Sequence, residues 1–277
     1  MKRAYSLIAA VGLMSAAPAM ADVQTWDFVY GAGTGIENND AHGLGSGTYI
    51  DMTSGGIELV ISAWSSSGNS GSCSAGDPAC DSSHNAYDQD PFIQRADLKK
   101  YAGYGLGAVN ADEGDDNPNH SFDNIGSATG WLDYDMALLQ FDTAVALEEI
   151  DINWRGTDSD MTVLTYTGGG TLAGNPFGAS STWTDLLNNG WSHVGNYADV
   201  STSSNAIISS ATESRYYLVG VYNPGFGTDN WSYGNDAIKI AGITTSTGNT
   251  TEVPEPASAL LLAAGLFGLA RRQRKMS

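Results

Sequence analysis

Short runs of alternating apolar and polar residues, separated by Gly, Asn and Ser, limit most strongly how this chain can fold. In residues 147–154, three apolar residues alternate with three polar ones, which places one face of a strand in a core and the other in water. A sustained helical repeat of apolar residues does not occur in the middle of the chain. The pattern predicts an all-β fold, an antiparallel β-sandwich of the jelly-roll type with long loops.

We expect residues 136–141 to form the strand next to residues 147–154, joined to it by residues 142–146. Thr53, Ser54, Gly55 and Gly56 predict a hairpin turn, and one short helix is expected over residues 182–188. Further strands are expected at residues 23–30, 48–52, 57–64, 97–101, 161–166, 216–222 and 237–243.

The charge balance disfavours one class of partner. The chain of 277 residues has 12 Lys and Arg against 31 Asp and Glu, and half of the basic residues lie at its two ends. Binding to nucleic acid relies on Lys and Arg replacing condensed counterions, so we expect no nucleic-acid partner. No break in composition divides residues 22–243, which predicts a single sandwich domain followed by a Ser/Thr/Gly-rich tether at residues 244–252.

The N-terminal segment, residues 1–21, has the parts of a secretory signal peptide. Lys2 and Arg3 precede an apolar run, and Ala19 and Ala21 form a small-x-small cleavage site. A buried N-terminal helix is the alternative. The three parts occur in the order that export requires, so we expect signal peptidase to cleave the chain before Asp22.

The C-terminal segment, residues 253–277, also has three parts in order: Pro254, Glu255 and Pro256, an apolar run at residues 257–270, and a basic tail at residues 271–275. As a helix the run would rise roughly 21 Å, short of the ~30 Å hydrocarbon core, which suits a transient membrane anchor. The basic tail would then remain on the cytoplasmic side. An ordinary permanent anchor is the alternative.

These C-terminal features resemble the PEP-CTERM sorting signal. The resemblance implies a Gram-negative bacterium, cleavage near Pro254–Pro256 by a membrane-embedded exosortase, and delivery to the cell surface or an exopolysaccharide-rich extracellular matrix. On this reading the protein is a substrate of processing enzymes and is not itself an enzyme.

Cys73 and Cys80 are the two cysteines of the chain, and they lie in a Ser/Gly/Asn/Asp-rich stretch. An even number of closely spaced cysteines in an exported chain predicts a disulfide that closes one loop. A zinc site would need a distant fourth ligand in addition to His84, and we consider it the weaker interpretation.

Five carboxylates crowd within residues 112–124 and repel one another unless a cation or water separates them. Calcium suits such a loop, because it accepts 6–8 oxygen ligands in a flexible shell. A solvated acidic loop is the alternative. The predicted calcium ligands are Asp112, Glu113, Asp115, Asp116, Asp123 and Asn124.

Further acids precede other predicted strands. Asp133 and Asp135, and likewise Asp158 and Asp160, could add ligands to the same ion or merely cap turns. Asp160 is therefore a weaker candidate ligand. Asp236 is a second one, on the analogy of jelly-roll carbohydrate-binding modules, in which an acid near the final strand often joins a structural calcium.

The central part of the chain resembles exosortase-dependent surface proteins that share a D-E-G, an H-x-x-D-N and a D-S-D segment. The residues that carry this resemblance are Asp112, Glu113, Gly114, His120, Asp123, Asn124, Asp158 and Asp160. Ser121 and Phe122 replace the small apolar residues that are more usual there. The resemblance implies an envelope location and no reaction.

Motifs for a nucleophile elbow, a zinc protease or a phosphate loop do not occur, so we expect no enzymatic activity, and a secreted hydrolase is the weakest alternative function. Exposed aromatic residues beside polar groups are typical of sugar sites, and exopolysaccharide binding is therefore the main alternative function. The aromatic candidates are Trp183, Trp191, Tyr197, Trp231 and Tyr233. The preferred function is a structural or adhesive surface protein with a stabilising calcium ion.

Overall fold

The computed structural model describes residues 21–31, 36–38, 48–68, 92–110, 120–125, 133–172, 176–178, 181–208, 212–227 and 229–248, the side chains of residues 67 and 68 excepted. Most of them belong to one compact unit, Val23–Thr247. No helix in these ranges is long and apolar enough to cross a membrane.

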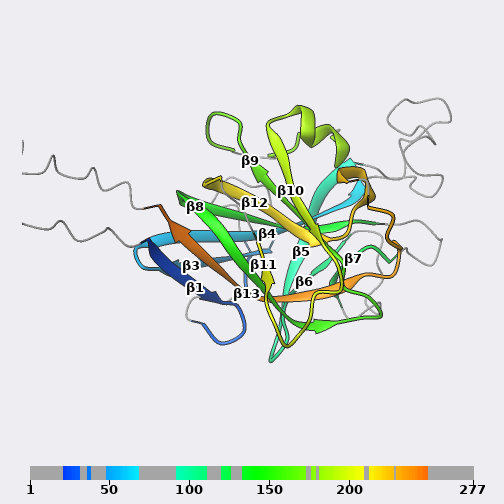
Figure 1. Cartoon of the computed structure of the whole chain (residues 1–277), viewed down its shortest axis with the longest axis horizontal. Helices are drawn as coiled ribbons and strands as arrows, with labels where there is room; N and C mark the ends of the chain where they lie inside the picture. The colour runs from blue at the N-terminus through cyan, green and yellow to red at the C-terminus, as the bar shows by residue number, and fades with distance from the viewer. Residues whose placement is uncertain are drawn as a thin grey trace, which may run out of the picture. The chain divides into compact units, whose positions relative to one another are not determined.

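The described ranges contain thirteen strands and two short 3-10 helices (Figure 1). The helices are η2 (Thr184–Asn188) and η3 (Pro224–Phe226). The strands are β1 (Asp22–Asp27), β2 (Glu37–Asn38), β3 (Thr48–Ser54), β4 (Ile57–Gly68), β5 (Phe92–Tyr101), β6 (Gly105–Val109), β7 (Phe122–Asp123), β8 (Asp135–Arg155), β9 (Met161–Tyr166), β10 (Trp191–Tyr197), β11 (Ala206–Ile207), β12 (Ser214–Val221) and β13 (Ala237–Thr247).

Five strands close into a barrel, in the order β8-β13-β6-β5-β4 and back to β8. The strands pair antiparallel, and the ring closes because β5 and β8 each change partner along their length. On β5, Ala96 pairs with β4 whereas Asp97 pairs with β6. The prediction of an all-β antiparallel fold is confirmed. The jelly-roll sandwich is not confirmed, since the strand pairing describes a closed five-strand barrel with additional strands.

Strand β8 corrects one prediction. Residues 136–141 and 147–154 are not neighbouring strands but the two halves of β8, which also includes residues 142–146. The exposed Asp142 resembles a turn residue, yet its Oδ1 accepts a hydrogen bond from Glu58 N at 3.1 Å. The first half pairs with β4 and β12, and the second half with β13.

Two apolar cores lie on opposite faces of the sheet that includes β4, β8 and β12. On β8, Ala137 and Leu139 belong to the main core, whereas Met136 and Leu138 belong to the second core. This division follows from the alternation of side chains along a strand. The second core is completed by residues from the β9–β10 connection, including the buried Trp183 just before η2.

Two local predictions can be compared directly. Gly55 and Gly56 form the β3–β4 turn with φ of 58° and 82°, which confirms the predicted hairpin. Residues 244–247 were expected in the tether, but β13 continues to Thr247. The physical reason is that Thr245 is buried, pairs with Leu147 on β8 and accepts a hydrogen bond from Trp26 Nε1 at 3.0 Å.

Candidate functional site

Strands β7 and β13 meet at a buried junction between Asn124 and Asp236. Asn124 Nδ2 donates to Asp236 Oδ2 at 2.7 Å, and Asp236 N donates to Asn124 Oδ1 at 2.9 Å. Asn124 Nδ2 also donates to the carbonyl oxygen of Tyr222 at 3.0 Å. The two side chains are completely buried. The junction therefore connects three segments: the chain after β12 at Tyr222, the chain after β7 at Asn124, and the start of β13 at Asp236.

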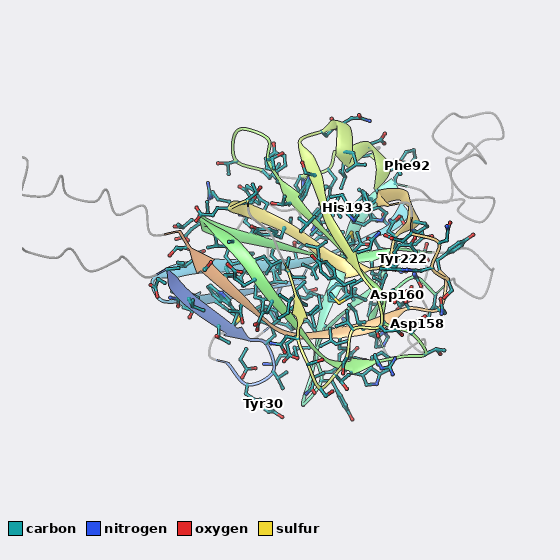
Figure 2. All side chains as sticks on the ribbon, viewed as in Figure 1. Tyr30, Phe92, Asp158, Asp160, His193 and Tyr222 are labelled. Atoms are coloured by element: carbon teal, nitrogen blue, oxygen red, sulfur yellow. The ribbon has the colours of Figure 1, made fainter. Side chains whose placement is uncertain are left out.

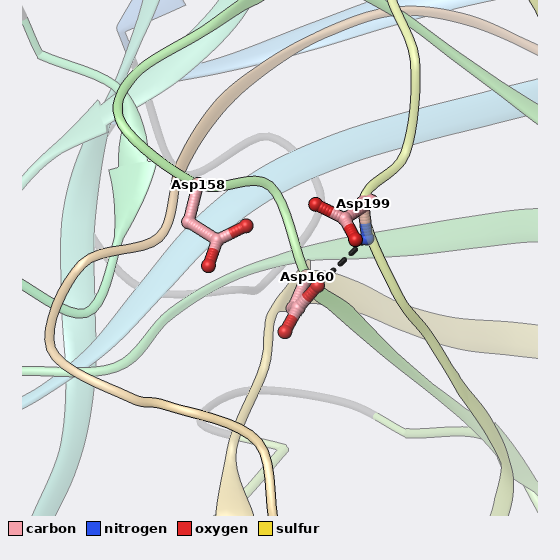
Figure 3. A group of neighbouring side chains, drawn as sticks. All are labelled: Asp158, Asp160 and Asp199. Carbon is pink, nitrogen blue, oxygen red and sulfur yellow. Dashed lines mark hydrogen bonds between the residues drawn. The ribbon is translucent and has the colours of Figure 1, made fainter.

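Three aspartates gather on one side of this junction and form the group that we call the outer acidic triad: Asp158, Asp160 and Asp199. One carboxylate oxygen of each lies within 4.8 Å of the others, so the triad could hold a metal ion (Figure 3). Asp160 is buried, Asp158 is half-buried and Asp199 is exposed, which leaves the group open to solvent on one side.

Backbone hydrogen bonds position the outer acidic triad. Asp160 Oδ1 accepts from Asp199 N at 2.7 Å, the dashed contact in Figure 3. Asp160 N in turn donates to Asp236 Oδ1 at 2.9 Å, and Asp158 forms a parallel bridge with Asp236. Asp199 has φ of 48°, a conformation that Asp tolerates better than most residues. Figure 2 shows Asp158, Asp160 and Tyr222 close together, and Tyr222 N donates to the Asp160 carbonyl oxygen at 2.8 Å.

Burial is the main electrostatic influence on these acids, because it disfavours the charged form. It raises the pKa of Asp236 to about 7, although the hydrogen bonds from Asn124 and Asp160 N act in the opposite direction. Burial also raises the pKa of Asp160, with a smaller contribution from Asp158 and Asp199. A cation at the outer acidic triad would offset the repulsion of Asp160 by Asp158 and Asp199.

A second set of acids lies deeper, and we call it the inner carboxylate group: Asp123, Asp133 and Asp135. All three side chains are buried. Burial, followed by the negative charge of Asp135, raises the pKa of Asp123 well above its ordinary value, and Asp133 adds to the effect. Burial raises the pKa of Asp135 to about 7. The negative charges of Asp135 and Asp133 therefore both act on the Asp123 carboxyl group.

Several donors contact the inner carboxylate group, among them Ile125 N, which donates to Asp123 Oδ1 at 3.1 Å. Asn110 Nδ2 donates to Asp135 Oδ1 at 3.4 Å, and Ser121 Oγ donates to Asp123 Oδ2 at 3.2 Å. Among the described residues, Asp135 Oδ2 has no hydrogen-bond partner of ordinary geometry. The neighbouring Ser65 hydroxyl and the Asp123 backbone N–H act against burial and lower the pKa of Asp135.

Lys239 is the basic residue that acts on this region. Its ammonium group lies 3.7 Å from the centre of the Trp154 ring and 4.8 Å from that of Tyr101. Burial lowers its pKa to about 8, and the negative charge of Asp123 opposes this shift. The contacts with the aromatic rings stabilise a buried cation. Among the described residues, Lys239 therefore supplies a positive charge that acts with the negative charge of Asp123.

The structure divides the described members of the predicted calcium ligand set among the two acidic groups and the junction. Asp123 belongs to the inner carboxylate group, whereas Asn124 and Asp236 form the junction, and Asp160 belongs to the outer acidic triad. The role of these four residues as calcium ligands stays a prediction. Several other predicted residues lie outside the described residues: Asp112, Glu113, Asp115, Asp116, Cys73, Cys80, Ala19, Pro254, Glu255 and Pro256.

Sequence reasoning did not identify Asp199 or Ser65. Asp199 follows β10 in a stretch without an acidic pattern, and only the fold brings it to Asp160. Ser65 belongs to a Ser-rich stretch, and its position opposite Asp135 depends on the β4–β8 register. A sequence pattern alone carries no signal for either residue, because both contacts join distant parts of the chain.

The aromatic residues predicted to contact sugar fall into two classes. Trp183 and Trp191 are buried in the second core and pack against Phe177, which removes them from the candidates for sugar contact. Trp231 is half-buried, with its ring 5.2 Å from that of Tyr222, and Tyr233 is exposed. Tyr197 is half-buried against the main core.

Residues 252–275 match the PEP-CTERM protein-sorting motif. This match confirms the C-terminal resemblance and indicates an exported protein that is targeted to an exosortase and delivered to the cell envelope or surface. The match covers the C-terminal segment alone, so the likeness of the central part to exosortase-dependent surface proteins stays a prediction. No curated protein and no solved structure matches the chain significantly.

Proposed function

We propose that this chain is a structural or adhesive protein of a Gram-negative cell surface or extracellular matrix, stabilised by calcium and without catalytic activity. The observation that carries the proposal is the sorting motif at residues 252–275, which indicates targeting to an exosortase. Signal peptidase and an exosortase would process the two ends, and membrane anchoring would be transient. The folded unit would then remain in the envelope or the matrix.

The contacts of the acidic residues support a structural role. The carboxylates of Asp160 and Asp236 accept hydrogen bonds from the backbone N–H groups of Asp199 and Asp160, so they hold separate segments of chain together. Calcium accepts oxygen ligands in a flexible arrangement, and the outer acidic triad offers three carboxylates from two segments. An ion there would join the chain before β9 to the chain after β10.

Processing can be tested on the protein from its native host. The intact mass of the mature protein would be measured in cells with and without the exosortase, together with its distribution between membrane and surface fractions. We expect a mass that lacks the basic tail at residues 271–275, and retention of the tail when the exosortase is deleted. A tail retained in both strains contradicts processing.

A second function has one specific observation in its favour. Trp231 lies against Tyr222, whose backbone N–H contacts Asp160 of the outer acidic triad, so a partly exposed aromatic ring lies close to the proposed calcium site. This arrangement is typical of calcium-dependent binding of carbohydrate. A glycan array with and without a chelator separates the two functions: saturable binding that the chelator abolishes supports a carbohydrate-binding module. Binding to no glycan supports the structural role.

A further inference from the structure

Two tyrosines beside the barrel strands are exposed to solvent. Tyr30 is 79% exposed and lies at the margin of the body in Figure 2, and Tyr104 is 50% exposed. Among the described aromatic residues, only these two and Tyr233 are exposed. A single exposed ring needs no explanation, but two exposed rings held next to each other indicate a recognition surface.

Hydrogen bonds fix the turn that presents Tyr30. Asp27, the last residue of β1, accepts from Val29 N at 2.8 Å and from Tyr30 N at 2.9 Å through its Oδ1. The carbonyl oxygen of Asp27 also accepts from Gly31 N at 3.1 Å. A turn closed by an Asp side chain in this way is held by its backbone and that carboxylate. The Tyr30 ring takes no part in these bonds, so it is exposed in a fixed place.

A second fixed turn, between β5 and β6, presents Tyr104. Tyr104 N donates to the Tyr101 carbonyl oxygen at 3.0 Å, Gly103 has φ of 81°, and Asn153 Nδ2 on β8 donates to the Gly103 carbonyl oxygen at 2.7 Å. The hydroxyl of Tyr30 ends beside the same glycine, 3.9 Å from the place that a Cβ of residue 103 would take. The two turns therefore bring Tyr30 and Tyr104 together.

Polar side chains of β8 adjoin the two tyrosines. Ile150 and Ile152 belong to the main core, so Asp151 and Asn153 lie on the opposite, outer face of the strand. Asn153 is exposed and Asp151 is half-buried. One carboxylate and one amide therefore lie next to each other on the face of β8 that contacts the Gly103 turn.

The crossing of β1 over β13 adds a second carboxylate. Gly242 on β13 pairs with Asp151, and a Cβ at Gly242 would lie 2.5 Å from the carbonyl oxygen of Trp26 and 3.8 Å from Asp27 Cα. The absence of a side chain at Gly242 thus allows β1 to pass close to β13 and places Asp27 near Asp151. Burial raises the pKa of Asp151, and the negative charge of Asp27 adds to the effect, which agrees with this placement.

These contacts join five residues into one continuous patch, which we call the tyrosine surface: Asp27, Tyr30, Tyr104, Asp151 and Asn153. We propose that the tyrosine surface binds a polysaccharide that lacks acidic groups. The inference rests on the adhesive role proposed above, and it names the ligand and the place of contact. Aromatic rings pack against the apolar faces of sugar rings, while carboxylate and amide groups hydrogen-bond to sugar hydroxyls.

Charge and composition favour this ligand over two others. Asp27 and Asp151 would repel a polysaccharide that carries carboxylate or sulfate groups, and the net charge of the chain, −19, acts in the same direction. None of the five members of the tyrosine surface has an aliphatic side chain, whereas the centre of a stable protein interface is ordinarily apolar. The tyrosine surface includes no member of the outer acidic triad, so its binding should not require calcium at that triad.

The experiment uses the full chain on an array of neutral and acidic glycans in the presence of a chelator, followed by calorimetric titration with the neutral glycan that binds best. We expect saturable binding to neutral glycans and none to acidic glycans. Tyr30→Ala and Tyr104→Ala should each weaken binding about tenfold. Tyr233→Ala is the matched control, since it removes another exposed ring and should leave the affinity unchanged.

Two further variants separate recognition from stability. Tyr30→Phe keeps the ring, so it should retain most of the affinity that Tyr30→Ala loses. Asp151→Asn removes one negative charge and keeps the shape of the side chain, so it should still bind neutral glycans and weaken the discrimination against acidic ones. Because both tyrosine rings are exposed, the Ala variants should melt at the temperature of the wild type.

Several results overturn the proposal. They are no binding to any neutral glycan, binding that the chelator abolishes, wild-type affinity in the chain that carries both Tyr30→Ala and Tyr104→Ala, and a loss of affinity in Tyr233→Ala alone. If neutral glycans do not bind while the mature protein has lost its basic tail and reached the surface, the tyrosine surface is refuted and the structural role is retained.

Discussion

Asn124 and Asp236 exchange two hydrogen bonds across 112 residues of sequence, Nδ2 to Oδ2 at 2.7 Å and backbone N to Oδ1 at 2.9 Å. Asn124 directly follows Asp123 of the inner carboxylate group, and Asp236 accepts from the backbone of Asp160 in the outer acidic triad. One buried contact therefore connects the two acidic groups, and the junction is the structural centre of the site.

Replacing Asn124 by Ala should destabilise the fold strongly. The substitution leaves the carbonyl oxygen of Tyr222 and two polar atoms of Asp236 without their Asn124 partner in the interior. Each buried group left unsatisfied costs about 1–3 kcal/mol, so we expect the free energy of unfolding to fall by about 3 kcal/mol or more. Urea denaturation of the full chain measures this change.

Asn205→Ala is the matched control for that substitution. Asn205 is exposed, and its Nδ2 donates to Glu149 Oε2 at 2.8 Å. Solvent can replace this hydrogen bond, so the control should change the free energy of unfolding by less than about 0.5 kcal/mol. Equal effects of the two substitutions would show that the junction has no special role.

The second core should depend on Trp183. Its side chain is buried, lies edge-on to Phe177 and donates from Nε1 to the Tyr134 carbonyl oxygen at 3.1 Å. We expect Trp183→Ala to lower the free energy of unfolding by about 3–5 kcal/mol. Leu187→Ala, on an exposed position of η2, should cost far less. If both variants unfold like the wild type, the β9–β10 connection does not cover a core.

Gly107 on β6 should not tolerate a side chain. A Cβ atom at this position would lie 1.9 Å from the carbonyl oxygen of His120 and 3.0 Å from Ser121 Cα. We expect Gly107→Ala to destabilise the fold by about 2 kcal/mol, because it displaces the chain that leads to Asp123. Gly169→Ala is the control, since a Cβ there meets nothing within 4 Å. Thermal unfolding of both variants gives the comparison.

The calcium-depleted protein should lose stability as the pH rises from about 4 to about 7. Burial raises the pKa of Asp236 to about 7, whereas the same carboxyl group ionises near 4 in the unfolded chain. In that window the folded state holds a proton that the unfolded state has released, so raising the pH favours unfolding. Asp135 acts in the same direction.

Saturating calcium should oppose this dependence, because an ion at the outer acidic triad binds the ionised form of Asp160, whose pKa burial also raises, and competes with protons there. The measurement is urea denaturation between pH 5 and pH 8, with and without calcium. A free energy of unfolding that rises from pH 5 to pH 7 in the depleted protein would contradict the burial of these carboxyl groups.

The sequence predicts the local structure well where alternation and turn residues decide it. The β3–β4 hairpin with Gly55 and Gly56 and the antiparallel all-β class follow from these signals. The continuity of β8 through residues 142–146 could not be predicted, because its polar residues look like a turn and are held extended by the contact of Asp142 with Glu58. The extension of β13 to Thr247 depends likewise on pairing with β8.

The candidate site was predicted only in part. The five carboxylates within residues 112–124 predicted Asp123 as a metal ligand. The position of Asp160 and Asp236 just before predicted strands made them weaker candidates. Their division into two groups depends on long-range strand pairing, as does the approach of Asp199 and Ser65 to their partners. Buried contacts between residues far apart in sequence leave no local pattern, so composition predicts the chemistry of the site but not its geometry.

The central claim is that calcium stabilises the exported body of this protein, and titration of calcium chloride into the calcium-depleted full chain, followed by thermal unfolding, tests it most directly. The account predicts saturable heat of binding and a melting temperature that rises with calcium and falls again when a chelator is added. Absence of binding heat together with an unchanged melting temperature would contradict it.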